Sequence, residues 1–214
     1  MILYHGSIEI VKQPIYGKGK IYNDYGQGFY CTESIELAKE WACTDNKDGY
    51  ANQYQLDTSD LKIINLLSEE YNVLHWLALL MQHRVVRLSS PLMKSSCSWL
   101  KEHYMPNISD ADIIVGYRAD DSYFAFARAF ANNEISLAQL SRAMMLGKLG
   151  EQIVLKSQKA FDAIQFQNAI YVDRLEYYPK RQARDLEVRN AYMELLEKGD
   201  IDGIFIRELI RGEV

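Results

Sequence analysis

Hydrophobic positions alternate with polar ones in several short runs, which predicts strands, and recur at three- and four-residue spacing elsewhere, which predicts helices. In the first run, Leu3 and His5 share one face and Ile2 and Tyr4 the other. Strands are expected at 2–7, 29–31, 50–56, 61–66, 113–117, 153–155, 163–166, 169–172 and 203–206. Helices are expected at 35–42 after a Thr32 or Ser34 cap, 68–83, around Trp99, 123–131, from a Ser136 cap to 145, and 184–198. The pattern therefore predicts an α+β protein.

The segment from Lys12 to Gly28 interrupts this pattern. It carries four glycines and three tyrosines without an apolar period. Loops of this length tend to be lids or binding loops in compact domains, although an insertion without a role is the alternative. We expect this loop to be mobile and to serve a site.

The 214 residues, 48% of them hydrophobic, are enough to bury a sizeable core. We expect a main domain at 1–168, with a helical insertion at about 68–110. Residues 169–214 are expected to add a helix-strand extension packed on the same domain.

The net charge is -5 with both signs interspersed, so the chain lacks the broad basic field that drives non-specific nucleic-acid binding. A local basic cluster lies near the start of the last predicted helix, at Lys180, Arg181, Arg184 and Arg189. A solvated helix face is the preferred interpretation of this cluster, and a phosphate-binding patch is the alternative.

Three cysteines show no paired spacing, and the four histidines have no zinc-ligand pattern around them, so we expect reduced thiols and no metal site. The longest hydrophobic stretch, Val73–Met81, is interrupted by His75 and is too short to cross a bilayer. The N-terminus has no charged segment followed by an apolar run. We therefore expect a cytoplasmic protein without membrane association.

Three short windows carry candidate chemistry. The first strand ends in Leu3–Ser7, with a histidine, a glycine and a hydroxyl, and Gly26–Tyr30 follows it. Trp41 stands eleven residues after Tyr30, and a late strand opens with Glu151–Leu155. A histidine at a strand end is usually structural, but the motif residues further along the chain favour a functional site.

These windows, in this order, resemble the three signature motifs of the ADP-ribosyltransferases of the poly(ADP-ribose) polymerase and diphtheria-toxin type. The whole chain, including Tyr117–Phe124, is also similar to an uncharacterised bacterial family with an ADP-ribosyltransferase-like core. Members of that family are often encoded beside small antitoxin-like partners. The resemblance implies a split mixed β-sheet core with helical insertions, and NAD+ as substrate.

The resemblance also implies roles for individual residues. Tyr30 and Trp41 would sandwich the nicotinamide ring, and Glu151 would bind a ribose hydroxyl and stabilise positive charge on the ribose. By parity Glu151 shares the face of Ile153 and Leu155 and is expected at the cleft edge; an exposed strand-start carboxylate is the alternative. The implied catalytic residues are Glu151, His5 and Tyr30, and the implied NAD+-binding residues are His5, Gly6, Ser7, Gly28, Tyr30, Trp41 and Arg118.

Two positions depart from the family pattern. Ala38 stands where the family has a small hydroxyl residue that helps to hold the carboxamide. Gln152 directly follows Glu151, so a strand shifted by one residue would present an amide instead of a carboxylate. For Arg118 two interpretations stay open, a clamp on the pyrophosphate or a target, and an internal salt bridge to a nearby aspartate.

The predicted function is mono-ADP-ribosylation of a macromolecular acceptor with release of nicotinamide, by a bacterial toxin or defence effector. A protein acceptor is favoured over a nucleic acid, and a small antitoxin protein is an expected partner. The alternatives are an NAD+ glycohydrolase and a catalytically inactive module that binds NAD+, ADP-ribose or a partner. A structural protein without affinity for NAD+ is a further class.

Overall fold

Two β-sheets form the centre of the protein, whose structure is a computed structural model that describes residues 1–88, 90–119, 121–146 and 151–213. The first sheet has the order β1-β3-β7 and is antiparallel throughout. The second has the order β2-β6-β5-β4, in which β4 and β5 run parallel and the other pairs are antiparallel. The strands are β1 (Ile2–Ser7), β2 (Phe29–Cys31), β3 (Gly49–Leu56), β4 (Ile63–Asn65), β5 (Ile113–Tyr117), β6 (Glu151–Leu155) and β7 (Ile164–Val172). The expected α+β class with a split mixed sheet is confirmed.

The two sheets are joined where β1 passes the end of β2. The backbone N–H of Tyr4 donates to the carbonyl of Thr32 at 2.8 Å, and the N–H of Thr32 donates back to Tyr4 at 3.0 Å. A buried apolar cluster that includes Leu3, Cys31 and Leu155 fills the space between the sheets. This junction brings the ends of β1, β2 and β6 together.

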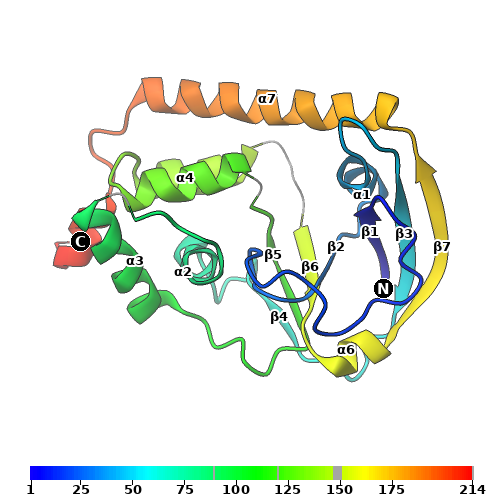
Figure 1. The fold of residues 1–214 in the computed structure, drawn as a ribbon. Helices are drawn as coiled ribbons and strands as arrows, with labels where there is room; N and C mark the ends of the chain where they lie inside the picture. The colour runs from blue at the N-terminus through cyan, green and yellow to red at the C-terminus, as the bar shows by residue number, and fades with distance from the viewer. Residues whose placement is uncertain (89, 120, 147–150, 214) are drawn as a thin grey trace.

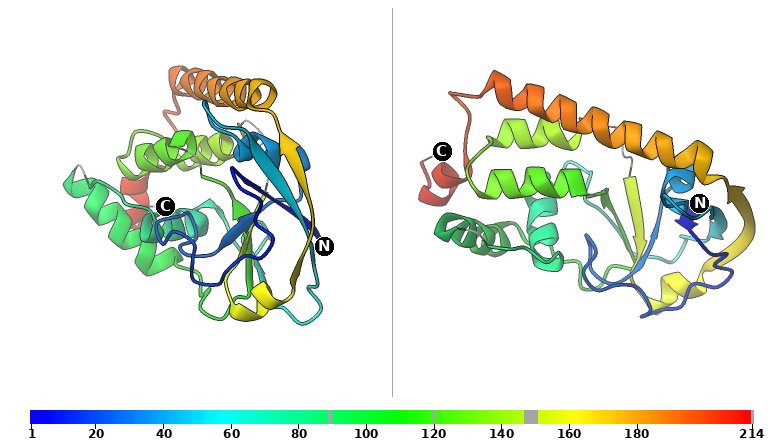
Figure 2. Two further views of the ribbon diagram at one scale, coloured as in Figure 1. Left: turned by 45° about the vertical axis from the view of Figure 1, so that its right-hand side comes forward. Right: turned by 45° about the horizontal axis from the view of Figure 1, so that its top comes forward.

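Helix α1 packs on β1 and β3 of the first sheet. Figure 1 shows α2, α3 and α4 beyond the four-stranded sheet, on the side away from β1, β3 and β7. The long helix α7 runs along one edge of the molecule and packs on α1, α4 and α5, as Figure 2 also shows. The helices are α1 (Ile35–Ala42), α2 (Val73–His83), α3 (Pro91–Tyr104), α4 (Asp121–Ala131), α5 (Leu137–Met144), α6 (Gln158–Asp162), α7 (Arg174–Lys198) and α8 (Ile206–Arg211).

Helix α1 lies unusually close to the first sheet because two glycines face it. A Cβ atom at Gly6 would stand 2.1 Å from the carbonyl oxygen of Ala38, and one at Gly49 would stand 2.0 Å from that of Ala42. The helix begins where the Ser34 hydroxyl accepts a hydrogen bond from the N–H of Leu37, so Ser34, and not Thr32, is the cap. Gly6 therefore seats the helix that carries Trp41.

Three sequence predictions need correction. The expected strands 163–166 and 169–172 are one strand, β7, with a register irregularity in its pairing to β3. Helix α7 begins at Arg174, ten residues before its expected start, and includes Pro179. The expected closing strand at 203–206 is wrong, because the carbonyl of Ile204 accepts from the N–H of Leu137 and the chain then enters α8.

Among the helices that the structure describes, none combines the length and the apolar character needed to cross a membrane. The three cysteines are buried and form no disulfide.

Candidate active site

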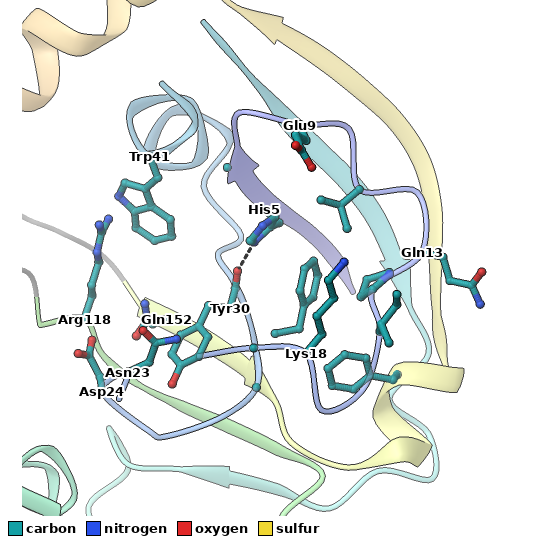
Figure 3. Close-up of a pocket in the computed structure, with 18 of the residues that line it drawn as sticks. His5, Glu9, Gln13, Lys18, Asn23, Asp24, Tyr30, Trp41, Arg118 and Gln152 are labelled. Atoms are coloured by element: carbon teal, nitrogen blue, oxygen red, sulfur yellow. Dashed lines mark hydrogen bonds between the residues drawn. The ribbon is translucent and has the colours of Figure 1, made fainter. Parts of the chain in front are cut away.

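A cavity of about 540 Å³ opens where the two sheets meet. Figure 3 shows His5, Tyr30 and Gln152 around it, from β1, β2 and β6. Trp41 comes from α1, and Arg118 directly follows β5. The loop expected to serve a site does line the cavity, through Gln13, Pro14, Ile15, Lys18, Gly19, Asn23, Asp24 and Gly28.

His5 is held as a neutral hydrogen-bond acceptor. Its Nδ1 lies 2.8 Å from the carbonyl oxygen of Tyr30, and because a carbonyl only accepts, Nδ1 carries the proton and Nε2 keeps a lone pair. Burial lowers the pKa of His5 below its ordinary 6.5, although the bond to Tyr30 opposes the shift. The ring also packs on Phe29, with centroids 4.4 Å apart. At neutral pH His5 therefore offers an acceptor.

Tyr30 is fixed by its hydroxyl, which donates to the carbonyl of Gly26 at 2.5 Å and accepts from the N–H of Tyr25 at 3.1 Å. Burial raises the pKa of this hydroxyl well above its ordinary value of 10, so it stays protonated. Lys156 secures the same loop, because its Nζ donates to the carbonyls of Tyr25 and Gln27 at 2.5 and 2.6 Å. Tyr30 therefore contributes a rigid aromatic surface.

Gln152 is the residue that β6 turns toward the cavity. It is 6% exposed and lines the pocket, and its side-chain Oε1 is enclosed and has no hydrogen-bond partner among the residues that the structure describes. Strand pairing puts it on the same face as Val154 and Tyr30. The side chain thus reaches the pocket wall and carries an unsatisfied acceptor just beneath it.

Glu151 has the opposite parity, is exposed and does not line the cavity. Its parity is the expected one, shared with Ile153 and Leu155, but the cavity lining does not support its expected place at the cleft edge. The structure shows the arrangement that a one-residue shift was expected to produce, in which the strand presents an amide.

Trp41 and Arg118 form the opposite side of the pocket. The guanidinium carbon of Arg118 lies 3.9 Å from the centroid of the Trp41 ring, a close cation–π contact. Figure 3 shows the Arg118 side chain reaching up toward Trp41. One face of the ring expected to stack on nicotinamide is therefore occupied by Arg118.

Ser7 does not line the cavity, and its expected role as an NAD+ contact is not supported by its place. Its hydroxyl donates to the carbonyl of Glu9 and accepts from the Asn52 amide at 3.2 Å. Gly6 and Gly28 do line the cavity, but the missing side chain of Gly28 makes room for Val154 and Leu155 of β6. These small residues shape the walls.

Asn52 is the organising residue that the sequence reasoning missed. It is fully buried, its Nδ2 donates to the carbonyls of His5 and Glu9 at 3.2 Å, and its Oδ1 accepts from the N–H of Val11 at 3.0 Å. It thereby fixes the chain as it leaves the His5 strand. Asn52 has the same parity as Tyr54 and Leu56, which are buried. A single amide on an otherwise apolar strand face is the sequence signal that could have identified it.

Charged groups at the pocket are mainly basic. The Asp24 carboxylate accepts from the N–H of Ala119 at 2.9 Å and lies 3.7 Å from Arg84, so its charge is compensated. Lys18 and Arg84 line the cavity together with Arg118. Such a pocket suits a ligand that is anionic and also carries hydrogen-bond donors for His5 Nε2 and Gln152 Oε1.

The fold and pocket define an α+β protein with a cavity at the junction of two sheets. The chain belongs to the family described as a protein of unknown function (DUF3990), whose model matches residues 1–166. That match includes every strand that lines the pocket and ends before α7. No curated protein and no solved structure matches the chain.

Proposed function

We propose that this protein binds NAD+ in the pocket and transfers its ADP-ribose to a macromolecular acceptor as a mono-ADP-ribosyltransferase. The observation that carries the proposal is the unpartnered Oε1 of Gln152. A buried acceptor without a partner costs about 1–3 kcal/mol, a cost that a ligand donor removes. NAD+ offers such donors in its ribose hydroxyls and its carboxamide.

The rest of the pocket fits the same ligand. His5 Nε2 is a second acceptor for a ribose hydroxyl, and Tyr30 offers an aromatic face to the nicotinamide ring. Lys18 lines the cavity and can contribute positive charge to the pyrophosphate. The three motif windows, far apart in the sequence, all contribute a residue to this one cavity, which supports the resemblance to ADP-ribosyltransferases.

The transfer needs little proton chemistry. The bond between the ribose C1′ and the nicotinamide nitrogen breaks, and its electron pair neutralises the departing ring, so no general acid is required. Gln152 would orient the ribose through a hydroxyl. An amide dipole stabilises the positive charge that develops on the ribose less than a carboxylate does, so we expect slow turnover.

Release of nicotinamide from labelled NAD+ tests the proposal. We expect release by the unaltered protein and an about tenfold slower rate for Gln152→Leu, the effect of losing roughly 1.4 kcal/mol of transition-state stabilisation. Gln152→Glu should be faster than the unaltered protein, because it places a full negative charge at the same position. Glu151→Gln should stay within about threefold, since Glu151 lies outside the pocket.

Absence of release by the unaltered protein would exclude the transferase. Loss of release in Glu151→Gln alone would show that the working enzyme uses the neighbouring register. A cellular role as a toxin or defence effector, restrained by a small antitoxin protein, is proposed from the resemblance and is tested by expressing the same variants in bacteria.

A second candidate is a binding module that holds NAD+ or ADP-ribose without chemistry. Two observations favour it. Position 152 carries an amide and not a carboxylate, and the carboxylates that line the pocket are either ion-paired, as Asp24 is, or exposed, as Glu9 is. This candidate predicts calorimetric binding of NAD+ with no nicotinamide release. An NAD+ glycohydrolase would instead release nicotinamide without labelling any component of a cell lysate.

A further inference from the structure

A second cavity, of about 470 Å³, lies between α1 and α7. Arginines are concentrated in it: Arg118, Arg181, Arg184 and Arg189 all line its wall. Glu40, Asp45 and Asp185 also line the wall, so four arginines against three carboxylates leave it a formal charge of +1 in a chain of net charge -5. Three residues of the basic cluster seen in the sequence, Arg181, Arg184 and Arg189, are therefore part of a cavity wall, whereas Lys180 is not.

The two cavities are neighbours that share a wall. Trp41 and Arg118 line both, and their stacked contact separates one space from the other. Figure 3 shows this pair at the left-hand edge of the first pocket. A group bound in the second cavity would thus approach the first one through the Trp41–Arg118 contact.

The second cavity already binds carboxylates of its own chain. Arg184 holds Glu40 through two hydrogen bonds of 2.7 and 2.9 Å, and Arg189 holds Asp185 at 2.8 Å. Arg181 is exposed and makes no salt bridge within the residues that the structure describes. The guanidinium of Arg181 can therefore bind a carboxylate that belongs to another molecule.

The chemistry of the first pocket restricts the acceptor further. A hydroxyl or amine acceptor must lose a proton, yet the described acidic side chains at the first pocket are ion-paired, as Asp24 is, or exposed, as Glu9 is. Burial lowers the pKa of His5, which makes it a weak base. A carboxylate is already ionised at neutral pH and needs no base.

Building on the proposed function, we propose that the cavity between α1 and α7 binds the acceptor, and that the acceptor group is the carboxylate of a glutamate or aspartate on a protein. The carboxylate oxygen forms a bond to C1′ as the bond from C1′ to nicotinamide breaks. The electron pair of that bond passes to nicotinamide. The negative charge of the acceptor and the positive charge of the ring cancel, and no proton moves.

The test uses NAD+ labelled in its adenylate phosphate, a cell lysate as the source of acceptors, and the full-length protein. Arg181→Glu should lower protein labelling at least tenfold and leave nicotinamide release without lysate within twofold. Arg207→Glu makes the same charge change on α8, outside both cavities, and should label normally. The label should be released by neutral hydroxylamine, which cleaves esters.

The possible results separate the acceptor site from the transferase itself. Normal labelling by Arg181→Glu would overturn the acceptor cavity while leaving the transferase intact. A hydroxylamine-resistant label, or one removed by nucleases, would overturn the carboxylate acceptor. If the unaltered protein releases no nicotinamide, both the proposed transferase activity and the proposed acceptor site are refuted.

Discussion

The two sides of the pocket are built in different ways. The strand wall, defined by His5, Tyr30 and Gln152, is fixed by hydrogen bonds within and between the two sheets. The helix wall, defined by Trp41 and Arg118, includes a cation–π contact at 3.9 Å and borders a second cavity. The strand wall is preorganised for a ligand, whereas the helix wall has the simpler task of separating two spaces.

This difference suggests a division of labour. A preorganised wall keeps its acceptors in place at no cost when the ligand binds. The side chains of the helix wall lie between the two cavities, where a partner that enters from the α7 side would meet them. The strand wall should therefore govern affinity for NAD+, and the helix wall should govern access of the acceptor.

The largest effect is expected at Asn52, which supports the strand wall. Asn52→Leu removes the donor for the His5 carbonyl and the acceptor for the Val11 N–H, leaving buried groups unsatisfied. We expect a loss of about 3 kcal/mol in the free energy of unfolding, measured by urea denaturation. The matched variant Gln55→Leu, exposed on the same strand, should change it by less than about 0.5 kcal/mol. Equal effects would show that Asn52 does not organise this wall.

A smaller effect is expected at Glu40, which ties α1, the helix of Trp41, to α7. Glu40→Gln leaves Arg184 without its charge partner; the two side chains are 6% and 28% exposed. Partial exposure of the arginine reduces the expected destabilisation to about 2 kcal/mol, also read from urea denaturation. The exposed pair of Glu176 and Lys180 on α7 provides the control, since Glu176→Gln should leave the free energy of unfolding nearly unchanged. A Glu40 variant as mild as this control would refute the anchoring role.

The smallest effect is a pH dependence from His5. Its pKa is lowered in the folded state, so between that pKa and 6.5 the unfolded chain binds more protons and stability rises with pH. The contribution is complete above pH 6.5 and is lost as pH falls below it. We expect urea midpoints to fall less between pH 7.5 and 5.5 in His5→Asn than in the unaltered protein. His75 and His83, whose pKa values burial also lowers, act in both proteins. Identical slopes would exclude His5 as the source.

Elements with local signals were predictable from the sequence. Helix α1 has the expected bounds because a capping serine, Ser34, and its apolar positions lie within a few residues of one another. Strand β5 likewise matches its apolar run, Ile113–Tyr117. In both, the information that fixes the element is contained in the element itself.

Elements whose form depends on distant contacts were not predictable. Helix α7 begins ten residues before its expected start, contains Pro179 in its second turn and buries Tyr177 nearby. The apolar run that ends at Ile206 is compatible with a strand or a helix, and the contact of Ile204 with Leu137 decides the outcome. Tertiary packing outweighed local preference in both places.

The same distinction holds within the site. Motif order predicted that His5, Tyr30, Trp41 and Arg118 would meet, and they do line one pocket. It could not decide which face of β6 points inward, because a strand pattern fixes alternation but not its direction. The role of Asn52 also escaped prediction, since its partners come from separate parts of the chain.

Calorimetric titration with NAD+ tests most directly whether Gln152 recognises the ligand in this pocket. The comparison uses the unaltered protein, Gln152→Leu and Glu151→Leu, with thermal unfolding to confirm that each is folded. Gln152→Leu should raise the Kd about tenfold, consistent with the loss of roughly 1.4 kcal/mol, while Glu151→Leu stays within about twofold. The opposite order of effects, or no NAD+ binding by the unaltered protein, would contradict the assignment of this pocket.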